Sequence, residues 1–263
     1  MQIKDQLQRV LNFKDTPKRI VCLVPSITEL ICDLGLETSL VGVTKFCVHP
    51  HHIMKNVTVV GGTKQVHYDK IRALNPGIIL CNKEENTKEM TQDLEAIAPV
   101  HISDMETIAD CLELIKMYGD IFNCSETSYN LISKIKEAAS DFREFIKIQP
   151  KRKVSYFIWK DPWMVAANDT FVNYLLSLNN FENAFQNKSR YPEISLDKTY
   201  PDVDLVLLSS EPYPFKEKHK SLIYQQFPNA KILLVDGEMF SWYGSRLVLA
   251  FDYFKTLHRN VLN

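Results

Sequence analysis

The sequence has no long hydrophobic run and no strong charge. No stretch of its 263 residues approaches the ~20 consecutive apolar residues that a membrane-spanning helix needs. The formal net charge is −1, so the overall charge favours neither nucleic acid nor an anionic membrane surface. Low-complexity tracts and short repeats are missing too. With 45% hydrophobic and 24% charged residues, the chain has the composition of an ordinary globular protein with a sizeable core.

Motifs for metal binding, phosphate binding and thiol chemistry are equally scarce. The six cysteines include no C-x-x-C pair, so we expect buried, reduced thiols. No H-E-x-x-H spacing is present, although His49, His51 and His52 form a cluster. Gly61-Gly62 matches no phosphate-loop motif, which favours a tight turn. The sequence therefore predicts no catalytic residue, no metal site of its own and no intrinsic cofactor.

An export signal is also missing from the sequence as written. Residues 1–21 are polar and of mixed charge, without the apolar segment or the lipidated cysteine of such a signal. We therefore expect a cytoplasmic protein if the chain is complete, or a mature exported protein if a leader was removed.

The most informative feature that is present is a long amphipathic stretch at residues 125–147. Its hydrophobic positions recur at steps of three and four: Leu131, Ile135, Ala138, Phe142 and Phe145. That period is typical of an α-helix with one apolar face, about 34 Å long at ~1.5 Å per residue. No Gly or Pro interrupts the stretch, and Pro150 follows it. We predict one continuous helix.

Strand patterns alternate with helix patterns on both sides of this stretch. Short apolar runs lie at residues 19–24, 40–43, 57–60, 78–81, 100–102, 153–159, 203–210 and 231–237. Such alternation predicts an α/β fold of two α/β lobes with parallel sheets, joined by the long helix. The expected domains are an N-terminal α/β lobe (1–104), a helical linker (105–150) and a C-terminal α/β lobe (151–263).

Two local signals refine the first lobe. Ser26 and Glu29 have the spacing of a capping box at the start of a short helix. Gly35 is well placed to end that helix.

Two segments, residues 71–86 and 196–213, share one order of features. Each has a proline, a short aliphatic strand and a polar loop with glutamate, which is Glu84 and Glu85 in the first and Glu211 in the second. Loops that follow parallel strands gather at the carboxyl edge of a sheet. These glutamates are either an acidic rim with a function or simply solvated loops.

The order and spacing of several segments resemble a known family. The segments are 16–44, 59–80, the long helix and, more weakly, 154–168, 202–219 and 239–250. Together they are similar to the helical-backbone (class III) substrate-binding proteins of ABC importers, which include the vitamin B12-binding and ferric-siderophore-binding proteins. The resemblance implies two α/β lobes, a rigid linker helix, a metal chelate bound between the lobes and modest closure on binding.

The resemblance also implies which residues line the ligand site. They are Phe46, His49, Asn82, Trp163, Trp242, Tyr243 and Arg246. Trp163 and Trp242 lie in polar segments beside Pro or Gly, which favours exposed stacking platforms over core aromatics. His49 suits an axial ligand or a hydrogen-bond donor to a chelate, and an ordinary loop histidine is the alternative.

In the family, one glutamate of each lobe docks against arginines of the membrane permease. Arginine binds a carboxylate with two parallel hydrogen bonds, so two such carboxylates fix the orientation of docking. By residue type and place, the candidates here are Glu84, Glu85 or Glu89 in the first lobe and Glu211 or Glu217 in the second, with Glu85, Glu89 and Glu211 preferred.

The predicted function is therefore a non-catalytic, monomeric binding protein that delivers a corrinoid, a ferric siderophore or haem to an ABC importer. The cobalt or iron chelate is its cargo, and no nucleic-acid partner is expected. Family resemblance implies the periplasm if a leader was removed. Two alternatives stay open: a cytoplasmic corrinoid or metal sensor or chaperone, and a chelatase-like enzyme that uses His49, His51 or His52 with Glu29 or Glu85.

Overall fold

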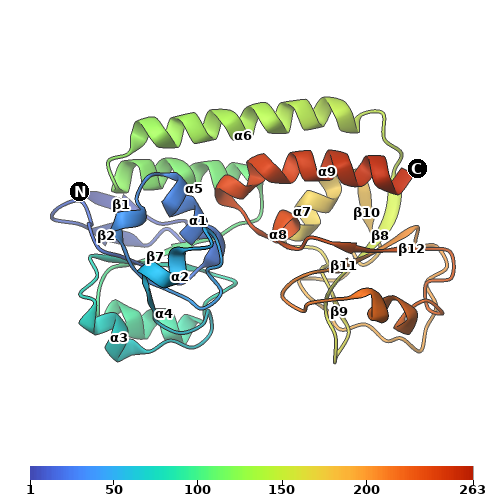
Figure 1. Cartoon of the computed structure of the whole chain (residues 1–263), viewed down its shortest axis with the longest axis horizontal. Coiled ribbons are helices and arrows are strands. Elements are labelled where there is room, and N and C mark those ends of the chain that lie inside the picture. The colour runs from blue at the N-terminus through green and yellow to red at the C-terminus, as the bar shows by residue number, and fades with distance from the viewer. Residues whose placement is uncertain (263) are drawn as a thin grey trace. The chain divides into compact units, whose positions relative to one another are not determined.

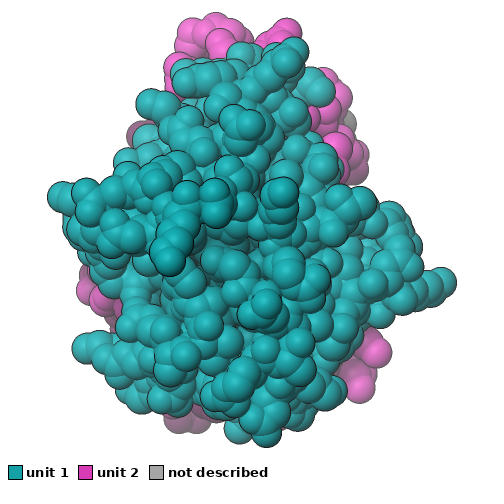
Figure 2. Space-filling model, turned by 90° about the vertical axis from the view of Figure 1, so that its left-hand side faces the viewer, with its two compact units in different colours: residues 1–136, 243–246 teal, residues 137–242, 247–263 magenta. Residues whose placement is uncertain are grey.

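The computed structural model describes residues 1–262, with side chains up to residue 260. The chain forms two compact units. Unit 1 contains Met1–Lys136 and Tyr243–Arg246, and unit 2 contains Glu137–Trp242 and the chain from Leu247 onward. Figure 1 follows the elements along the chain, and Figure 2 colours the atoms of the two units separately.

Unit 1 is built on a five-stranded sheet. Its strands in spatial order are β5 (Thr58–Val59), β4 (Leu40–Val43), β3 (Ile20–Cys22), β6 (Ile78–Asn82) and β7 (Val100–Ser103). All neighbouring strands run parallel. Strands β3, β6 and β7 are buried along their whole length, as expected for a parallel sheet covered on both faces. A short antiparallel hairpin pairs β1 (Gln2–Lys4) with β2 (Val10–Asn12).

Helices connect the strands of the unit 1 sheet, and one more helix, α5, follows its last strand. They are α1 (Pro25–Asp33), η1 (Glu37–Ser39), α2 (Ile53–Asn56), α3 (Tyr68–Ala73), α4 (Lys88–Glu95) and α5 (Ile108–Ile121). Helix α5 begins with a capping box in which the side chains of Thr107 and Asp110 each accept a backbone N–H of the other residue. Local sequence chemistry therefore fixes where this helix starts.

The two local predictions for α1 have opposite outcomes. Gly35 follows the helix with a φ of 79°, a conformation that glycine adopts without strain, so the predicted stop is confirmed. The predicted capping box is wrong, because the helix begins at Pro25 after Val24, which makes no side-chain cap. Glu29 is instead bound by Arg246, a residue far away in the sequence.

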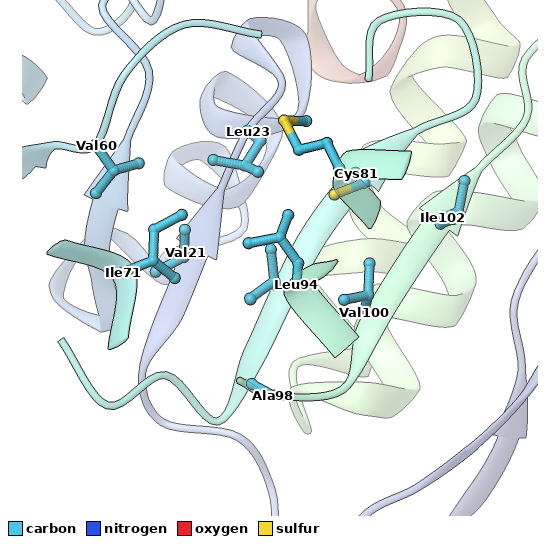
Figure 3. Packing of buried hydrophobic residues seen from close by; sticks show 11 residues of the cluster. Val21, Leu23, Val60, Ile71, Cys81, Leu94, Ala98, Val100 and Ile102 are labelled. Carbon is cyan, nitrogen blue, oxygen red and sulfur yellow. The ribbon is translucent and has the colours of Figure 1, made fainter. Parts of the chain in front are cut away.

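The core of unit 1 packs against one face of its sheet. Figure 3 shows side chains of β3, β6 and β7, among them Val21, Cys81 and Val100, pointing toward Ile71 of α3 and Leu94 of α4. All five side chains are fully or almost fully buried. The alternation of strand and helix patterns in the sequence predicted a sheet covered by helices, and the structure of unit 1 has this arrangement.

The long helix of the sequence is α6 (Ser125–Ile146), 22 residues without a break. It begins where the predicted stretch begins and ends one residue earlier, so the predicted helix is confirmed. The boundary between the two units falls inside it, between Lys136 and Glu137. The chain therefore passes from one unit to the other within a helix.

Unit 2 contains a second sheet of the same kind. Its parallel strands in spatial order are β10 (Phe181–Asn183), β8 (Arg152–Trp159), β11 (Leu205–Ser209) and β12 (Lys231–Val235). Strand β9 (Met164–Val165) adds to β8 in the antiparallel direction. The helices are α7 (Phe171–Leu178), η2 (Glu217–Leu222), α8 (Glu238–Ser241) and α9 (Leu247–Leu262), and η3 (Gly244–Arg246) belongs to unit 1.

The predicted fold class, two α/β lobes with parallel sheets and a long helix, is confirmed by these elements. The division into residues 1–104, 105–150 and 151–263 stays a prediction. In the described part of the chain, no helix combines the length and the hydrophobicity that crossing a membrane requires.

Candidate ligand-binding and docking residues

The two sheets have the same kind of strand order, and this order predicts a ligand site at the carboxyl ends of the strands. In unit 1 the chain starts the sheet at β3, adds β4 on one side and later β6 on the other. In unit 2 it starts at β8, adds β10 on one side and β11 on the other. Ligands of open α/β sheets bind at the carboxyl ends of such strands, where the order reverses. We therefore consider the carboxyl edge of each unit separately.

Asn82 ends β6 at the carboxyl edge of unit 1. Its Oδ1 accepts the backbone N–H of Glu84 at 2.8 Å and of Glu85 at 3.2 Å. Its Nδ2 donates to the hydroxyl of Ser103 at 3.0 Å and to that residue's carbonyl at 3.2 Å. Asn82 is only 2% exposed. Its amide therefore shapes the loop that carries Glu84 and Glu85, and its ligand contact stays a prediction.

A buried ion pair lies beside this edge in unit 1. The guanidinium of Arg246 binds the carboxylate of Glu29 through Nε at 2.8 Å and through a terminal nitrogen at 2.6 Å. The side chains are 6% and 13% exposed, respectively. Such a two-point contact is the strongest geometry for an arginine and a carboxylate. It anchors η3 on α1.

Tyr243, the neighbour of η3, is 5% exposed. Burial raises its pKa well above the usual value. Ser103, the last residue of β7, accepts a hydrogen bond from the amide of Asn82, so a buried polar contact links the ends of β6 and β7. The ligand contact of Tyr243 stays a prediction.

The loop after β4 holds the other two candidates of unit 1. Phe46 is 49% exposed, with the ammonium of Lys45 5.0 Å from its ring centre. His49 is half-buried, and its ring centre lies 5.1 Å from that of His51. In the described residues, no group of three or more His, Cys, Asp or Glu side chains could hold a metal ion.

The glycine pair beside this loop forms a turn, as predicted. Gly61 has a φ of 132°, and Gly62 N–H donates to the carbonyl of Gln65 at 2.7 Å. A Cβ on Gly61 would lie 2.6 Å from that same carbonyl oxygen, so only glycine fits.

In unit 2, Trp242 and the docking candidate Glu211 bind each other. The indole Nε1–H donates to a carboxylate oxygen of Glu211 at 2.8 Å, and the hydroxyl of Ser241 donates to the same oxygen at 2.6 Å. Burial raises the pKa of Glu211 above its usual value, and the nearby carboxylates of Glu238 and Asp236 add to the rise. This carboxylate therefore already has a positioning role inside unit 2.

Trp242 is 6% exposed, so the exposure that its sequence context favoured is wrong. Trp163 is half-buried. Its ring stacks on Phe215 with centres 6.0 Å apart and meets the edge of Phe157 at 5.6 Å. Their contact with a ligand stays a prediction for both tryptophans.

The docking candidates of unit 1 lie on or near α4. Glu89 is exposed in the first turn of that helix, where the helix dipole favours a negative charge. Glu85 is half-buried in the loop that Asn82 shapes. Their docking role stays a prediction.

Sequence reasoning missed two features. The pair of Glu29 and Arg246 joins residues that are 217 positions apart, and no local pattern signals it. Trp159, the last residue of β8, is 39% exposed and contacts Tyr213 with ring centres 5.7 Å apart. An apolar strand that ends in Trp just before the turn at Asp161-Pro162 was a usable signal for this residue.

Two surface hollows have none of the predicted ligand residues in their linings. One, of about 480 Å³, is lined in unit 2 by residues of β11 and β12 and by the acidic residues Asp236 and Glu238. The other, of about 750 Å³, lies over α3 and α4 in unit 1. Neither contains a residue that the sequence assigned to the ligand.

Comparison with models of known protein families shows which family the chain belongs to. A family model described as "Periplasmic binding protein" matches residues 20–225, from β3 to beyond η2. The chain belongs to the periplasmic binding protein family. The resemblance that the sequence indicated is thereby confirmed.

Two curated relatives are similar over most of the chain. An uncharacterized ABC transporter substrate-binding lipoprotein of Bacillus subtilis (strain 168) is 26% identical over 201 residues, 73% of this chain and 63% of the relative. The vitamin B12-binding protein of Yersinia pseudotuberculosis serotype O:3 is 25% identical over 187 residues, 69% of this chain and 65% of the relative. The matched segments thus span slightly less than two thirds of these relatives.

Among solved structures, the chain is similar to the periplasmic heme-binding protein of Roseiflexus sp. RS-1 in its apo form. The TM-score is 0.82 at 18% identity, over 94% of this chain and 99% of that one. This structural similarity indicates that the two proteins share a fold, in agreement with the two sheets and the long helix α6 described above.

Proposed function

We propose that this family member is the substrate-binding component of an ABC importer and that its ligand is a metal chelate: a corrinoid, a ferric siderophore or haem. The observation that carries the proposal is the family match over residues 20–225, which includes strands of both sheets. The names of the relatives support it, since one is an ABC transporter substrate-binding lipoprotein and the other binds vitamin B12.

The side chains at the carboxyl edges suit such a ligand. A chelate of this size offers a flat or rounded face, which proteins bind with aromatic area and a few oriented polar groups. Phe46 in unit 1 and Trp163 in unit 2 supply partly exposed rings. His49 supplies an imidazole in the same loop as Phe46, suited to an axial ligand or a hydrogen bond.

We further propose that the chelate is cargo and that the protein performs no chemistry on it. The chelatase-like alternative would need His49, His51 or His52 to act with Glu29 or Glu85. Glu29 is already bound by Arg246, which favours a structural role for this carboxylate.

Delivery requires a permease and a place outside the cytoplasm. We propose Glu85 and Glu89 of unit 1 and Glu211 of unit 2 as docking carboxylates. Exposed Glu89 offers the cleanest test. The variant Glu89→Lys should lower uptake by a reconstituted importer without changing chelate affinity, whereas equal uptake would remove Glu89 from the docking surface.

Tryptophan quenching tests the ligand proposal. Cyanocobalamin, haemin and the ferric complex of a tris-catecholate siderophore are each titrated into the intact protein. N-acetyltryptophanamide, treated identically, corrects for light absorbed by the ligands. We expect saturable quenching at micromolar concentrations or below by one chelate, which is then recovered chemically unchanged. Binding by none of the three, or conversion of the chelate, would reject the proposal.

A further inference from the structure

A pair of aromatic side chains, one exposed and one half-buried, lies at the carboxyl edge of unit 2. Trp159 ends β8 and is 39% exposed. The ring of Tyr213, in the loop after β11, is inclined at 74° to its ring, with centres 5.7 Å apart. The backbone N–H of Tyr213 donates to the carbonyl of Ile158 at 3.2 Å. Strands β8 and β11 are direct neighbours in the sheet (Figure 1). The exposed indole therefore stands where the strand order of this sheet reverses.

The pair is backed by a continuous set of rings. Tyr213 contacts Phe215 at 4.7 Å between centres, and Phe215 stacks on Trp163 at 6.0 Å. Phe157, which is fully buried, then meets Trp163 at 5.6 Å. Because each ring contacts the next, the indole of Trp159 is held by packing although 39% of the residue is exposed. Such a pre-organised aromatic surface loses little freedom when a ligand stacks on it.

Positive charge gathers beside these rings. His219 contacts both Tyr213 and Phe215, with ring centres 5.5 and 5.6 Å away. The backbone N–H of Lys216 donates to Nδ1 of His219 at 2.8 Å, and Lys218 precedes His219 in η2. Nζ of Lys160 lies 5.7 Å from the centre of the Trp163 ring. Burial lowers the pKa of His219, and the charges of Lys218, Lys160 and Lys216 lower it further. A single exposed aromatic side chain is common on protein surfaces and does not by itself indicate a binding site. Here the exposed indole lies beside several positive charges, and this combination suits an anionic aromatic ligand.

Most of the local carboxylates are already paired. Asp161 binds Lys160, and Glu217 binds Lys220 at 2.9 Å. The ammonium groups of Lys216 and Lys218 have no ion-pair partner among the residues that the structure describes. Two positive charges therefore remain available for a ligand at this edge.

We propose that Trp159 and Tyr213, together with Lys216 and Lys218, form a platform for an anionic ligand with a flat conjugated face. This inference rests on the proposed function and narrows its ligand class. A porphyrin with carboxylate side chains and a ferric tris-catecholate both have this chemistry. Cyanocobalamin, whose ring carries neutral amides, does not. The face stacks on the indole, and the negative groups meet the lysines.

The test is equilibrium binding to the intact protein at low and high salt. The probes are haemin, metal-free protoporphyrin, a ferric tris-catecholate and cyanocobalamin. We expect either the two porphyrins or the catecholate complex to bind, which identifies the source of the anionic face. Trp159→Leu should weaken that binding about tenfold or more, and Trp159→Phe should restore part of it.

The lysines have a separate readout. Lys216→Gln combined with Lys218→Gln should weaken binding about tenfold at low salt and reduce its salt dependence, because two screened charge contacts are lost. Matched controls are Tyr129→Leu, an exposed aromatic of α6, and the pair Lys188→Gln and Lys198→Gln, exposed lysines elsewhere in unit 2. These controls should leave affinity and salt dependence unchanged. Urea midpoints equal to that of the unmodified protein establish that each variant folds.

The outcomes separate this inference from the proposed function. If a chelate binds the unmodified protein but the Trp159 and lysine variants bind it equally well, the platform is wrong and the function stands. Binding of cyanocobalamin alone would likewise overturn the platform and leave the function standing. If only metal-free protoporphyrin binds, and does so through Trp159, the platform stands and the metal-chelate function falls. If nothing binds, both are overturned.

Discussion

The carboxyl edges of the two units have the same topology and opposite chemistry. In unit 1 the edge is polar and buried, with the amide of Asn82, the hydroxyl of Tyr243 and the ion pair of Glu29 with Arg246. In unit 2 the edge is aromatic and partly open, with Trp159 39% exposed above a set of packed rings. Strand order therefore fixes where a site can form, and the loop residues decide what it can bind.

The largest effect expected from this contrast is at the ion pair of unit 1. Arg246→Met should lower the free energy of unfolding by about 3–5 kcal/mol, because the carboxylate of Glu29 stays buried without its partner. Urea unfolding followed by circular dichroism measures the loss. The double variant Glu29→Met with Arg246→Met should recover most of it, since no uncompensated charge remains. A double variant as unstable as the single one would show that the charge is not the cause.

The loss of stability at acid pH can be compared for one buried histidine in each unit. Burial lowers the pKa of His101 in unit 1 and of His258 in unit 2 to about 4. An unfolded imidazole binds a proton near pH 6.5, so the unfolded state binds more protons and stability falls as the pH drops from about 6.5 to about 4. His101→Leu should abolish roughly 3 kcal/mol of this acid loss, measured by urea unfolding at pH 7 and pH 4.

The matched variant His258→Leu separates burial from hydrogen bonding. The ring of His258 has a hydrogen bond of 3.1 Å with Oδ1 of Asn179, whereas neither ring nitrogen of His101 has a partner among the described residues. At pH 7, His258→Leu should therefore cost about 1–3 kcal/mol, and His101→Leu should be neutral or stabilising. A His101→Leu protein with the pH dependence of the unmodified protein would contradict this account.

The affinity for a chelate can be compared between variants of the polar edge in unit 1 and variants of the aromatic edge in unit 2. Trp163→Ala should weaken chelate binding by roughly 1–3 kcal/mol, the value of burying a large apolar side chain. Phe46→Ala in unit 1 should cost less, because Phe46 has a smaller ring. Trp163→Phe serves as the control for packing on Phe215. Unchanged affinity in Trp163→Ala would reject the assignment of this ring to the ligand.

The smallest effect concerns Glu211, a half-buried carboxylate of unit 2. Its pKa is raised in the fold, so its contribution to stability is greatest at low pH and is lost as the pH rises through the folded value. Glu211→Gln keeps an oxygen acceptor for Trp242 and Ser241 and removes the buried charge. The variant should be at least as stable as the unmodified protein at pH 7, with no advantage at pH 4. A stability deficit confined to pH 7 would contradict the raised pKa.

The sequence predicted the elements whose signals are local and periodic. The 3.6-residue period of residues 125–147 identified α6, and the aliphatic runs identified the strands of both sheets. Gly35 and Gly61 were predicted correctly because positive φ angles favour glycine at these turns.

The chemistry of the edges was harder to predict, because it depends on contacts between distant residues. The partner of Arg246 lies 217 positions away, and the partner of Trp242 lies 31 positions away in another loop. Polar neighbours in the sequence suggested an exposed Trp242, yet a hydrogen bond to Glu211 accompanies its burial. Trp159 was overlooked because it ends an apolar strand, where a buried ring is the usual expectation.

Equilibrium dialysis of the intact protein against cyanocobalamin, haemin and a ferric siderophore tests the central claim most directly. We expect one of these chelates to be retained at one molecule per chain, with its metal in place and its structure intact on recovery. Retention of none of them, or recovery of a chelate without its metal, would contradict the account of this protein as a carrier of metal chelates.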